Sequence, residues 1–308
     1  MDMHLPSALL QAPAAIVGRR SADTVEFDFS EQLHANFVAG QRAMWSRWTP
    51  EPRPCFNPAL LRDIRTYYDY LAGCGGRIGD GIEEHPIEYV VLASGIPGVF
   101  NMGGDLDLFR QSIENRDRAH LLTYGRACID VLYRNYIGHG LPLTTISLVQ
   151  GECLGGGFEA ALSSDVVIAE KSARFGFPEI LFNLFPGMGA YSFLDRRIGQ
   201  KATEELLTSG KIYSADEMLA LGVIDIVARD GEGEAEVGAL IKRRARSRNG
   251  LAALAAVRRR VHSIEFEELL NIVEIWVESA LRLNPRDLKL MQRLVSRQTN
   301  LGDSLQVH

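Results

Sequence analysis

The sequence predicts an α/β fold, and three observations lead to that prediction. Apolar strands alternate with glycine turns and amphipathic helices through the middle of the chain. With 46% hydrophobic and 23% charged residues, the 308-residue chain has a globular composition. Beyond residue 232 the pattern is helical only. We expect an N-terminal arm (1–22), an α/β core (23–231) and a C-terminal helical subdomain (232–308). By length alone, two domains fit as well as one domain with a helical appendage.

The first elements surround a proline-rich segment. Thr24–Phe29 alternates in the manner of a strand. Three prolines between Trp48 and Asn57 predict that the whole stretch MWSRWTPEPRPCFNP is extended loop. A helix is expected near Ala59–Leu71. The glycines of GCGGRIGDG (73–81) match no phosphate-binding motif, so they predict a flexible surface loop.

The middle of the chain repeats a unit of strand, glycine turn and helix. The expected strands are Ile87–Ser94, Thr144–Gln150, Val166–Ala169, Ala173–Phe175 and 223–228. The expected helices begin at Leu106 and after GECLGGG, and continue with Tyr191–Ile198, the capped segment 214–222, Leu251–His262 and Glu265–Leu283. One face of the last helix carries Leu269, Val273, Trp276, Ala280 and Leu283.

Charge and residue spacing exclude several function classes. A net charge of −6 disfavours binding to nucleic acid. Four scattered cysteines without a C-x-x-C pair favour a reducing, cytoplasmic location over a disulfide framework. The seven histidines show no metal-ligand spacing, so we expect no metal site. We expect neither secretion nor a membrane span, since no basic n-region and no apolar run of about 18 residues occurs.

Two glycine-rich turns after strands are the first candidates for a functional site. They are MGGD (102–105) and LGGGFE (154–159). Glycine lets backbone approach a ligand, and a helix opening near Gly156 adds positive dipole. The two turns could therefore aim a pair of N–H groups at a carbonyl oxygen, as an oxyanion hole does. Tight strand-to-helix turns are the simpler explanation of the glycines alone.

Two glutamates accompany these turns. Glu159 lies three residues after Gly156, and Glu179 lies 20 positions further on, both among apolar residues. Such surroundings raise the pKa of a carboxyl group, and two carboxyls facing one substrate could divide acid and base work. A helix-capping Glu159 and a solvated Glu179 explain the spacing equally well.

The run VQGECLGGGFEAALSSDVVIAEKSARFGFPEILFNLFPGMGA, with NMGGDL upstream, resembles the crotonase (enoyl-CoA hydratase/isomerase) superfamily. The resemblance implies a crotonase-like ββα spiral core followed by a helical region, assembled as trimers or dimers of trimers. It also implies oxyanion N–H donors at Gly104 and Gly156 and acid/base roles for Glu159 and Glu179. By analogy with the hydratases, Glu179 is the α-carbon base and Glu159 the acid at the hydroxyl; the reverse assignment stays open.

A closer resemblance, from about Val25 to about Arg297, is to the bacterial diffusible signal factor synthases. It rests on MWSRWTPEPRPCFNPALL, PEILFNLFPGMGAYSFL and the region Tyr124–Tyr136, which depart from typical hydratases. This resemblance implies dehydration of a 3-hydroxyacyl thioester on acyl carrier protein and hydrolysis to a free cis-2-unsaturated fatty acid used in quorum sensing. Besides the carrier (acyl carrier protein or coenzyme A) no cofactor is implied; a cognate sensor kinase is the implied regulatory partner.

The resemblance further suggests an acyl tunnel lined by Phe182, Met188, Trp276 and Leu294, although Trp276 and Leu294 are most simply core residues. The basic cluster between Lys242 and Arg260 would suit an acidic carrier, or is a solvated helix face. Cys153 is interpreted as a small buried residue and not a nucleophile. The alternative functions are an ordinary enoyl-CoA hydratase and a catalytically silent regulatory binding protein.

Overall fold

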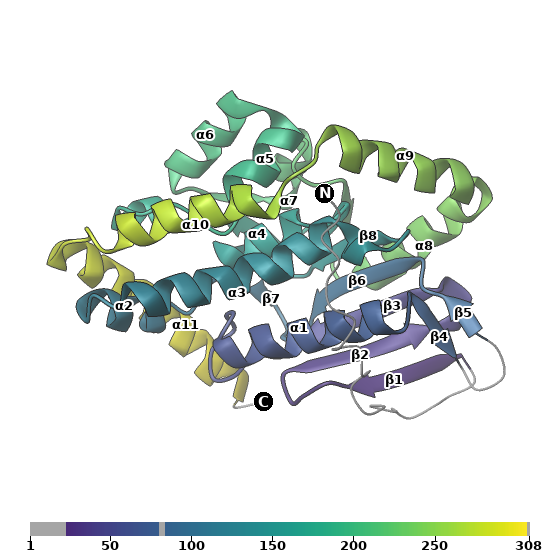
Figure 1. Cartoon of the computed structure of the whole chain (residues 1–308), viewed down its shortest axis with the longest axis horizontal. Coiled ribbons are helices and arrows are strands. Elements are labelled where there is room, and N and C mark those ends of the chain that lie inside the picture. Colours follow the sequence, from purple (N-terminus) through teal and green to yellow (C-terminus); the bar gives the residue numbers. More distant parts are fainter. Residues whose placement is uncertain (1–22, 80–83, 307–308) are drawn as a thin grey trace, which may run out of the picture.

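The structure is a computed structural model that describes residues 23–79 and 84–306, excepting the side chains of 297 and of 300 onward. The expected arm at 1–22 lies outside these residues. Two main sheets, of seven and four strands, and a set of covering helices make up most of the described part of the molecule, and Figure 1 shows the helices packed over the strands. This mixed α/β architecture with a helical C-terminal region confirms the predicted fold class.

The larger sheet has seven strands. Their order is β1 (Thr24–Asp28), β2 (Leu33–Val38), β3 (Ala43–Trp48), β6 (Tyr89–Ser94), β8 (Thr144–Val149), β10 (Val166–Glu170) and β13 (Ile226–Ala228). Strands β1 to β3 are antiparallel neighbours, and from β3 to β13 all pairs are parallel. The parallel strands are buried on both faces, which explains their continuous apolar sequences.

The smaller sheet has four strands in the order β12 (Ile212–Ser214), β11 (Arg174–Gly176), β9 (Glu152–Leu154) and β7 (Val99–Asn101). A separate two-stranded ribbon joins β4 (Arg77–Gly79) to β5 (Glu84–Pro86). Each of β6, β8 and β10 in the large sheet is followed in sequence by β7, β9 and β11 in the small one. A helical segment follows each pair, so the chain winds as a spiral of ββα units.

The helices cover these sheets. They are α1 (Pro58–Gly73), α2 (Leu106–Glu114), α3 (Arg118–Tyr136), α4 (Gly156–Leu162), α5 (Ala190–Ile198), α6 (Gln200–Ser209), α7 (Ala215–Ala220), α8 (Gly233–Arg244), α9 (Arg248–Val261), α10 (Phe266–Ala280) and α11 (Pro285–Gln306). Short 3₁₀ turns are η1 (Ala39–Gln41), η2 (Gly138–Gly140), η3 (Glu179–Phe182) and η4 (Ala245–Ser247). A capping box between Ser214 and Glu217 begins α7, as expected.

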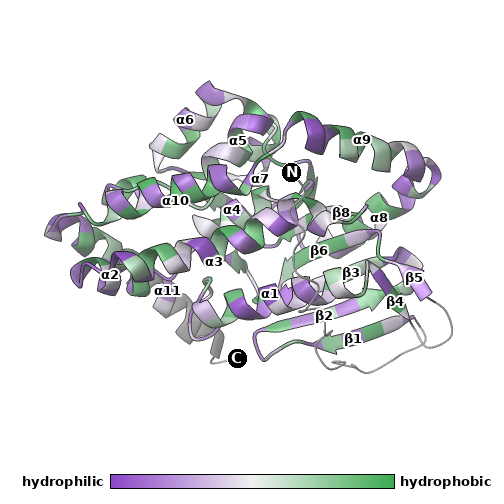
Figure 2. Ribbon diagram, viewed as in Figure 1, coloured by the Kyte–Doolittle hydropathy of each residue, from purple (hydrophilic) through white to green (hydrophobic). Residues whose placement is uncertain are grey.

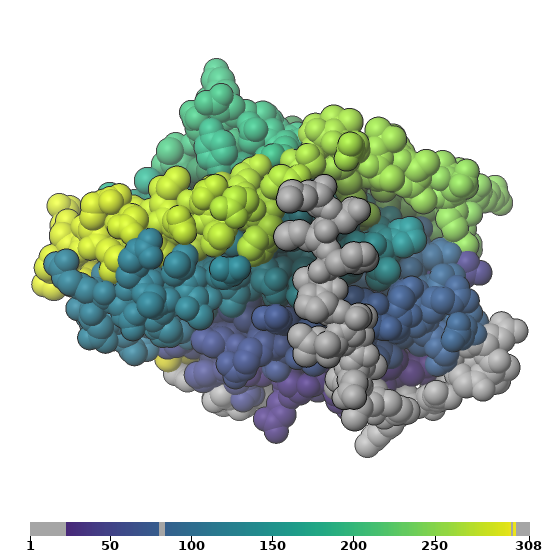
Figure 3. Space-filling view, viewed as in Figure 1, coloured from purple at the N-terminus to yellow at the C-terminus, as the bar shows by residue number. Residues whose placement is uncertain are grey.

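The C-terminal helices lie against the core. Figure 1 shows α10 running alongside α3, and Figure 3 shows α10 and α9 as a band across the same face. The predicted apolar face of α10 is buried at Leu269, Val273, Trp276 and Ala280, and Figure 2 shows its alternating hydrophobic and hydrophilic stripes. The domain boundary near 232 stays a prediction, since α8 packs its buried residues against the large sheet.

Two expectations for the N-terminal half are wrong. Met44–Trp48 is not loop but most of β3, between β2 and β6 in the large sheet. The prolines, which begin only at Pro50, do not disturb the ladder before them. The second strand, β2, was not predicted, although Leu33, Ala35 and Phe37 alternate and are buried. Residues 77–79 of the glycine-rich segment pair as β4 instead of forming loop.

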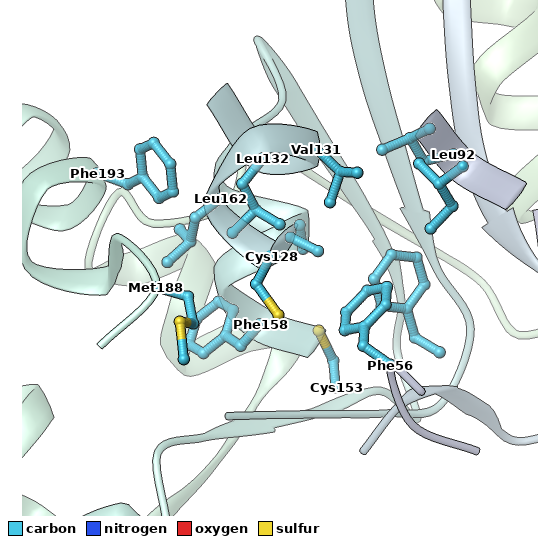
Figure 4. Close-up of a cluster of buried hydrophobic side chains, with 14 of the residues drawn as sticks. Phe56, Leu92, Cys128, Val131, Leu132, Cys153, Phe158, Leu162, Met188 and Phe193 are labelled. Atoms are coloured by element: carbon cyan, nitrogen blue, oxygen red, sulfur yellow. The ribbon is translucent and has the colours of Figure 1, made fainter. Parts of the chain in front are cut away.

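The main hydrophobic core lies between the sheets and the helices. Figure 4 shows part of it, where Phe56, Cys128, Cys153, Phe158 and Met188 arrive from separate segments. Cys153 is fully buried there, in agreement with its interpretation as a small core residue. In the part of the chain that the structure describes, no helix has the length and apolarity needed to cross a bilayer.

Candidate active site

Three successive ββα units deliver the predicted site residues to one place. Gly104 follows β7, Gly156 and Glu159 follow β9, and Glu179 follows β11. Because β7, β9 and β11 are parallel neighbours, their carboxyl ends meet at one edge of the small sheet. All four residues line a single cavity of about 50 Å³. The structure therefore brings together residues separated by up to 75 positions in sequence.

The two glycine turns lie against each other. A Cβ atom built on Gly156 would stand 3.3 Å from the Gly104 nitrogen, and one on Gly103 would stand 2.9 Å from the Gly156 nitrogen. Gly103 also has a φ of 92°, which a residue with a side chain rarely adopts. The glycines are thus required for the close approach of the two turns.

The orientation of both N–H groups is set by the carbonyls in the same peptide planes. The Gly103 carbonyl accepts from the Phe56 N–H at 2.8 Å, and the Gly155 carbonyl accepts from Phe158 and Glu159 N–H groups at 2.9 and 3.0 Å. In a trans peptide the N–H points opposite to the carbonyl. Among the described residues neither the Gly104 nor the Gly156 N–H has an acceptor. Both donors are therefore available for a ligand's carbonyl oxygen.

Glu159 is held in place by backbone N–H groups of the segment that leads into α5. Its side chain is 1% exposed, and Oε1 accepts from the N–H groups of Met188 and Ala190 at 2.7 and 3.0 Å. Burial raises the pKa of this carboxyl to about 7. The two hydrogen bonds favour the ionised form and partly offset this rise. Glu159 is therefore not a solvated helix cap.

Glu179 begins η3 beside the second glycine turn. A Cβ atom on Gly155 would lie 2.5 Å from Glu179 Oε1, and Glu179 Oε2 is buried with no partner among the described residues. Burial, and then the charge on Glu159, raise the pKa of Glu179 to about 8. Because the two carboxyls repel each other when both are charged, the pair favours holding one proton between these pKa values. The hydrogen bonds to Glu159 place the negative charge there and the proton on Glu179.

The remaining wall of the cavity is apolar. Phe182, Met188 and Trp276, three of the four residues expected to bind an acyl chain, line it, whereas Leu294, the fourth, is half-buried against the hydrophobic core and is not among the lining residues. A volume of about 50 Å³ holds a few water molecules. An acyl chain therefore needs some of these side chains to move.

Sequence reasoning missed two groups that support the first glycine turn. The Tyr124 hydroxyl is buried, donates to the Phe56 carbonyl at 2.5 Å and accepts from the Asp105 N–H at 3.2 Å. Phe56 and Tyr124 both line the cavity. They belong to two of the three segments in which the sequence departs from typical hydratases, and that departure was the signal that could have identified them.

Two members of the basic cluster between Lys242 and Arg260 are held in ion pairs with a buried carboxylate. Arg258 and Arg259 contact the two carboxylate oxygens of Asp165, at 2.5 and 2.6 Å, and Asp165 is 5% exposed at its side chain. They are a brace between α9 and the core and not part of a free docking face. The groove beside α9 runs along the starts of β6 and β8, whereas the glycine turns follow strand ends.

Comparisons with known proteins agree with this geometry. The sequence profile of the enoyl-CoA hydratase/isomerase family matches residues 81–269. The peroxisomal bifunctional enzyme of Pongo abelii is 32% identical over 176 residues, which are 57% of this chain and 21% of that protein. The mitochondrial methylglutaconyl-CoA hydratase of Rattus norvegicus is 31% identical over 150 residues, 48% of this chain and 45% of that protein. The chain thus spans less than half the length of these relatives.

Solved structures share the fold. The enoyl-CoA hydratase of Bacillus halodurans superimposes with a TM-score of 0.69 at 23% identity, covering 85% of this chain and 100% of that one. The structure of Pseudomonas aeruginosa DspI has a TM-score of 0.64 at 20% identity, covering 77% of this chain and 90% of that one. In the described residues, no cluster of metal-ligating side chains accompanies the site.

Proposed function

The chain belongs to the enoyl-CoA hydratase/isomerase family, and on that premise we propose that it dehydrates a 3-hydroxyacyl thioester to a cis-2-enoyl thioester and hydrolyses it to the free acid. The observation that carries the proposal is the meeting of two carboxyl groups and two N–H donors, which no described residue accepts from, around one apolar cavity. The proposed substrate is carried by acyl carrier protein or coenzyme A, and the product is a diffusible signal.

The dehydration step uses all four groups. The Gly104 and Gly156 N–H groups bind the thioester oxygen and stabilise the enolate that forms when a carboxylate removes the α-proton. The enolate electrons then form the double bond as the 3-hydroxyl leaves as water with a proton from the other carboxyl. One proton shared by Glu159 and Glu179 satisfies this requirement for one base and one acid.

The resting proton distribution matters for the direction of the reaction. A carboxylate at Glu159 and a carboxyl at Glu179 form the starting state for hydration if Glu179 faces the α-carbon. Dehydration with the same assignment needs the proton on Glu159 instead. Substrate dehydration therefore begins either from the less populated proton arrangement or with the reverse roles.

Hydrolysis would use the same oxyanion hole. A water molecule activated by a glutamate attacks the thioester carbon, the C–S bond breaks, and the thiol leaves with a proton. Two features support this step over simple hydratase chemistry. The divergent segments around Phe56 and Tyr124 meet at the first glycine turn (102–105), which carries the Gly104 N–H and is called the oxyanion turn below. Glu179 lies beside the Gly155–Gly156 turn, where the thioester carbon would lie.

The second candidate, an ordinary enoyl-CoA hydratase, is favoured by the names of the curated relatives. Incubation with 3-hydroxydodecanoyl carrier protein and with 3-hydroxydodecanoyl-CoA, followed by mass spectrometry and NMR, separates the two. We expect a free acid with a cis double bond at C2. A trans-2-enoyl thioester without free acid would establish the hydratase instead.

The control is a Glu159→Gln/Glu179→Gln double variant, which should form neither product. Absence of any product from the wild-type protein, with the acyl thioester still bound, would leave the catalytically silent binding protein.

Met188→Ala should shift the preferred acyl length upwards, because Met188 lines the cavity. Leu294→Ala should not change the preferred length.

A further inference from the structure

We propose that Gln298, on the last helix, is a positioning residue that fixes the oxyanion turn. This inference rests on the proposed function, because it assigns a task to the Gly104 N–H. Gln298 is 2% exposed, and its Nε2 donates to the Met102 carbonyl at 3.0 Å and to the Gly104 carbonyl at 3.2 Å. It lies 194 residues after Gly104, so nothing in the local sequence suggests the contact.

The two acceptors flank the peptide that matters. The Met102 and Gly104 carbonyls belong to the peptide planes immediately before and after the one that carries the Gly104 N–H. The middle plane is held through its own carbonyl by the Phe56 N–H. The Gln298 amide therefore restrains the peptide planes on both sides of the Gly103–Gly104 peptide, which Phe56 orients.

The need for such restraint follows from the residues in the turn. Gly103 and Gly104 have no side chains to limit their backbone dihedrals, and close packing against Gly156 at the first and against the Phe109 ring at the second leaves no room for one. A mobile turn would lose the preorganisation on which stabilisation of an oxyanion depends. Hydrogen bonds from residues outside the turn, Phe56 and Gln298, supply the missing restraint.

The Gln298 amide has a bonded nitrogen and an unbonded oxygen, which indicates that the nitrogen determines its orientation. Gln298 Oε1 is buried and has no partner among the described residues. An unsatisfied buried acceptor is unfavourable by about 1–3 kcal/mol. A flipped amide would place that oxygen against two carbonyl oxygens, so the Nε2 contacts determine the orientation.

The same helix also contacts the segment that carries Glu179. Asp287, near the start of α11, accepts a hydrogen bond from Asn183 Nδ2 at 3.2 Å, and Asn183 caps the end of η3. Met291 and Val295, between Asp287 and Gln298, are buried. Docking of α11 thus fixes the oxyanion turn and the η3 segment together.

Gln298→Met and Gln298→Glu test the proposal, because both keep the length of the side chain and remove its N–H donors. Gln292→Met is the matched control, since Gln292 is exposed on the same helix. We expect kcat for the Gln298 variants to fall about 10- to 100-fold with KM within about threefold, less than the loss of a whole oxyanion donor. The Gln292 variant should match the wild type.

A second readout does not depend on turnover. The probe is a hexanoyl-CoA analogue labelled with ¹³C at the carbonyl, in which a methylene group replaces the thioester sulfur. It lacks the 3-hydroxyl and the C–S bond, so it can be neither dehydrated nor hydrolysed, and the infrared stretching frequency of its carbonyl reports polarisation by the two N–H groups. The wild type and Gln292→Met should lower this frequency by the same amount. Gln298→Met should lower it less, with the thermal midpoint and circular dichroism confirming a folded protein.

The outcomes are distinguishable. Wild-type kcat and full polarisation in a folded Gln298→Met variant would overturn the positioning role, as would a raised KM with unchanged kcat. A wild type that polarises the carbonyl but turns over no substrate would refute the proposed function and leave the role of Gln298 standing. A wild type without polarisation would overturn both.

Discussion

Glu159 and Glu179 differ in what surrounds their carboxyl groups. Glu159 accepts two backbone N–H groups in a buried position, whereas Glu179 has one buried oxygen without a partner. The first arrangement favours a charge and the second a proton. The surroundings therefore distinguish Glu159, which favours the charged form, from Glu179, which favours the protonated form. Their spacing of 20 residues in the sequence does not make this distinction.

Glu159→Gln and Glu179→Gln should each lower kcat by about two to four powers of ten, the usual contribution of a positioned acid or base. The substitution is nearly isosteric, so circular dichroism and substrate binding should stay normal. Steady-state kinetics with the 3-hydroxyacyl thioester measures the loss. A variant that binds substrate and retains near-wild-type turnover would remove that glutamate from the mechanism.

The pH dependence of kcat/KM should be bell-shaped, with limbs near pH 7 and pH 8. Below about pH 7 Glu159 takes up a proton and the site lacks a base, whereas above about pH 8 Glu179 loses its proton and the site lacks an acid. A pH–rate series measures the limbs. A rate that stays flat between pH 6 and pH 9 would contradict the single-proton site.

Folding stability should fall as the pH rises through the same range. Both carboxyls have a pKa raised above the ordinary value of 4.5, so the folded protein binds more protons than the unfolded chain between those values. The stabilisation is complete below about pH 4.5 and is lost as pH passes 7 to 8. Urea titrations should show Glu179→Gln losing less stability between pH 5 and pH 8 than the wild type, by on the order of 1–3 kcal/mol. Equal pH slopes for the two proteins would refute the shift.

Helix α10 packs against α3 through a close contact between a glycine and a valine. Gly125 in α3 faces Val273 of α10, and Trp276, one turn further along α10, faces Gly187. Trp276 and Gly187 both line the cavity, so the position of α10 affects its width. The predicted apolar face of α10 is thereby also part of the candidate site.

Gly125→Ala should destabilise the protein by about 1–3 kcal/mol, since the new Cβ would lie 2.6 Å from Val273 Cγ1. Combining it with Val273→Ala should recover part of the loss, because the second change removes the obstructing methyl group. Gly250→Ala is the control: nothing lies within 4 Å there, and stability should rise by about 0.5–1 kcal/mol. Urea denaturation measures all three. Strict additivity in the double variant would show that the two positions do not meet.

At the scale of the whole molecule, Asp165 attaches α9 to the core. It accepts hydrogen bonds from Arg258 and Arg259 of that helix and from the Thr145 N–H in β8. The brace explains why reversing the charge of Arg258 would perturb the fold and not only a docking face. A test of carrier binding should therefore use the exposed Lys242 and Arg246.

Asp165→Asn should lower the free energy of unfolding by about 3 kcal/mol, because it leaves two arginines beside a neutral, buried group. Asp69→Asn is the matched control. Asp69 pairs with Arg134 at 2.6 Å but is 53% exposed at its side chain, so its loss should be below about 1 kcal/mol. Activity per folded molecule should be unchanged in both. Similar losses of stability for the two variants would mean that Asp165 is not a buried brace.

The sequence by itself determined the repeated strand, turn and helix units, because their periodicity is local and most expected elements occur within a few residues of the prediction. It also identified Gly104, Gly156, Glu159 and Glu179 as candidates, since the glycine turns and flanking apolar runs are continuous segments. It failed at β3, where nearby prolines obscured a strand that the ladder with β2 and β6 stabilises.

Only the tertiary structure decided which residues share the site and in which protonation state. The winding of the spiral brings β7, β9 and β11 side by side, and burial then sets the carboxyl pKa values. The position of Leu294 outside the cavity lining and the contacts of Gln298 depend on how α11 docks. Such contacts join residues nearly 200 positions apart, and no local pattern encodes them, because packing and not periodicity selects the partner.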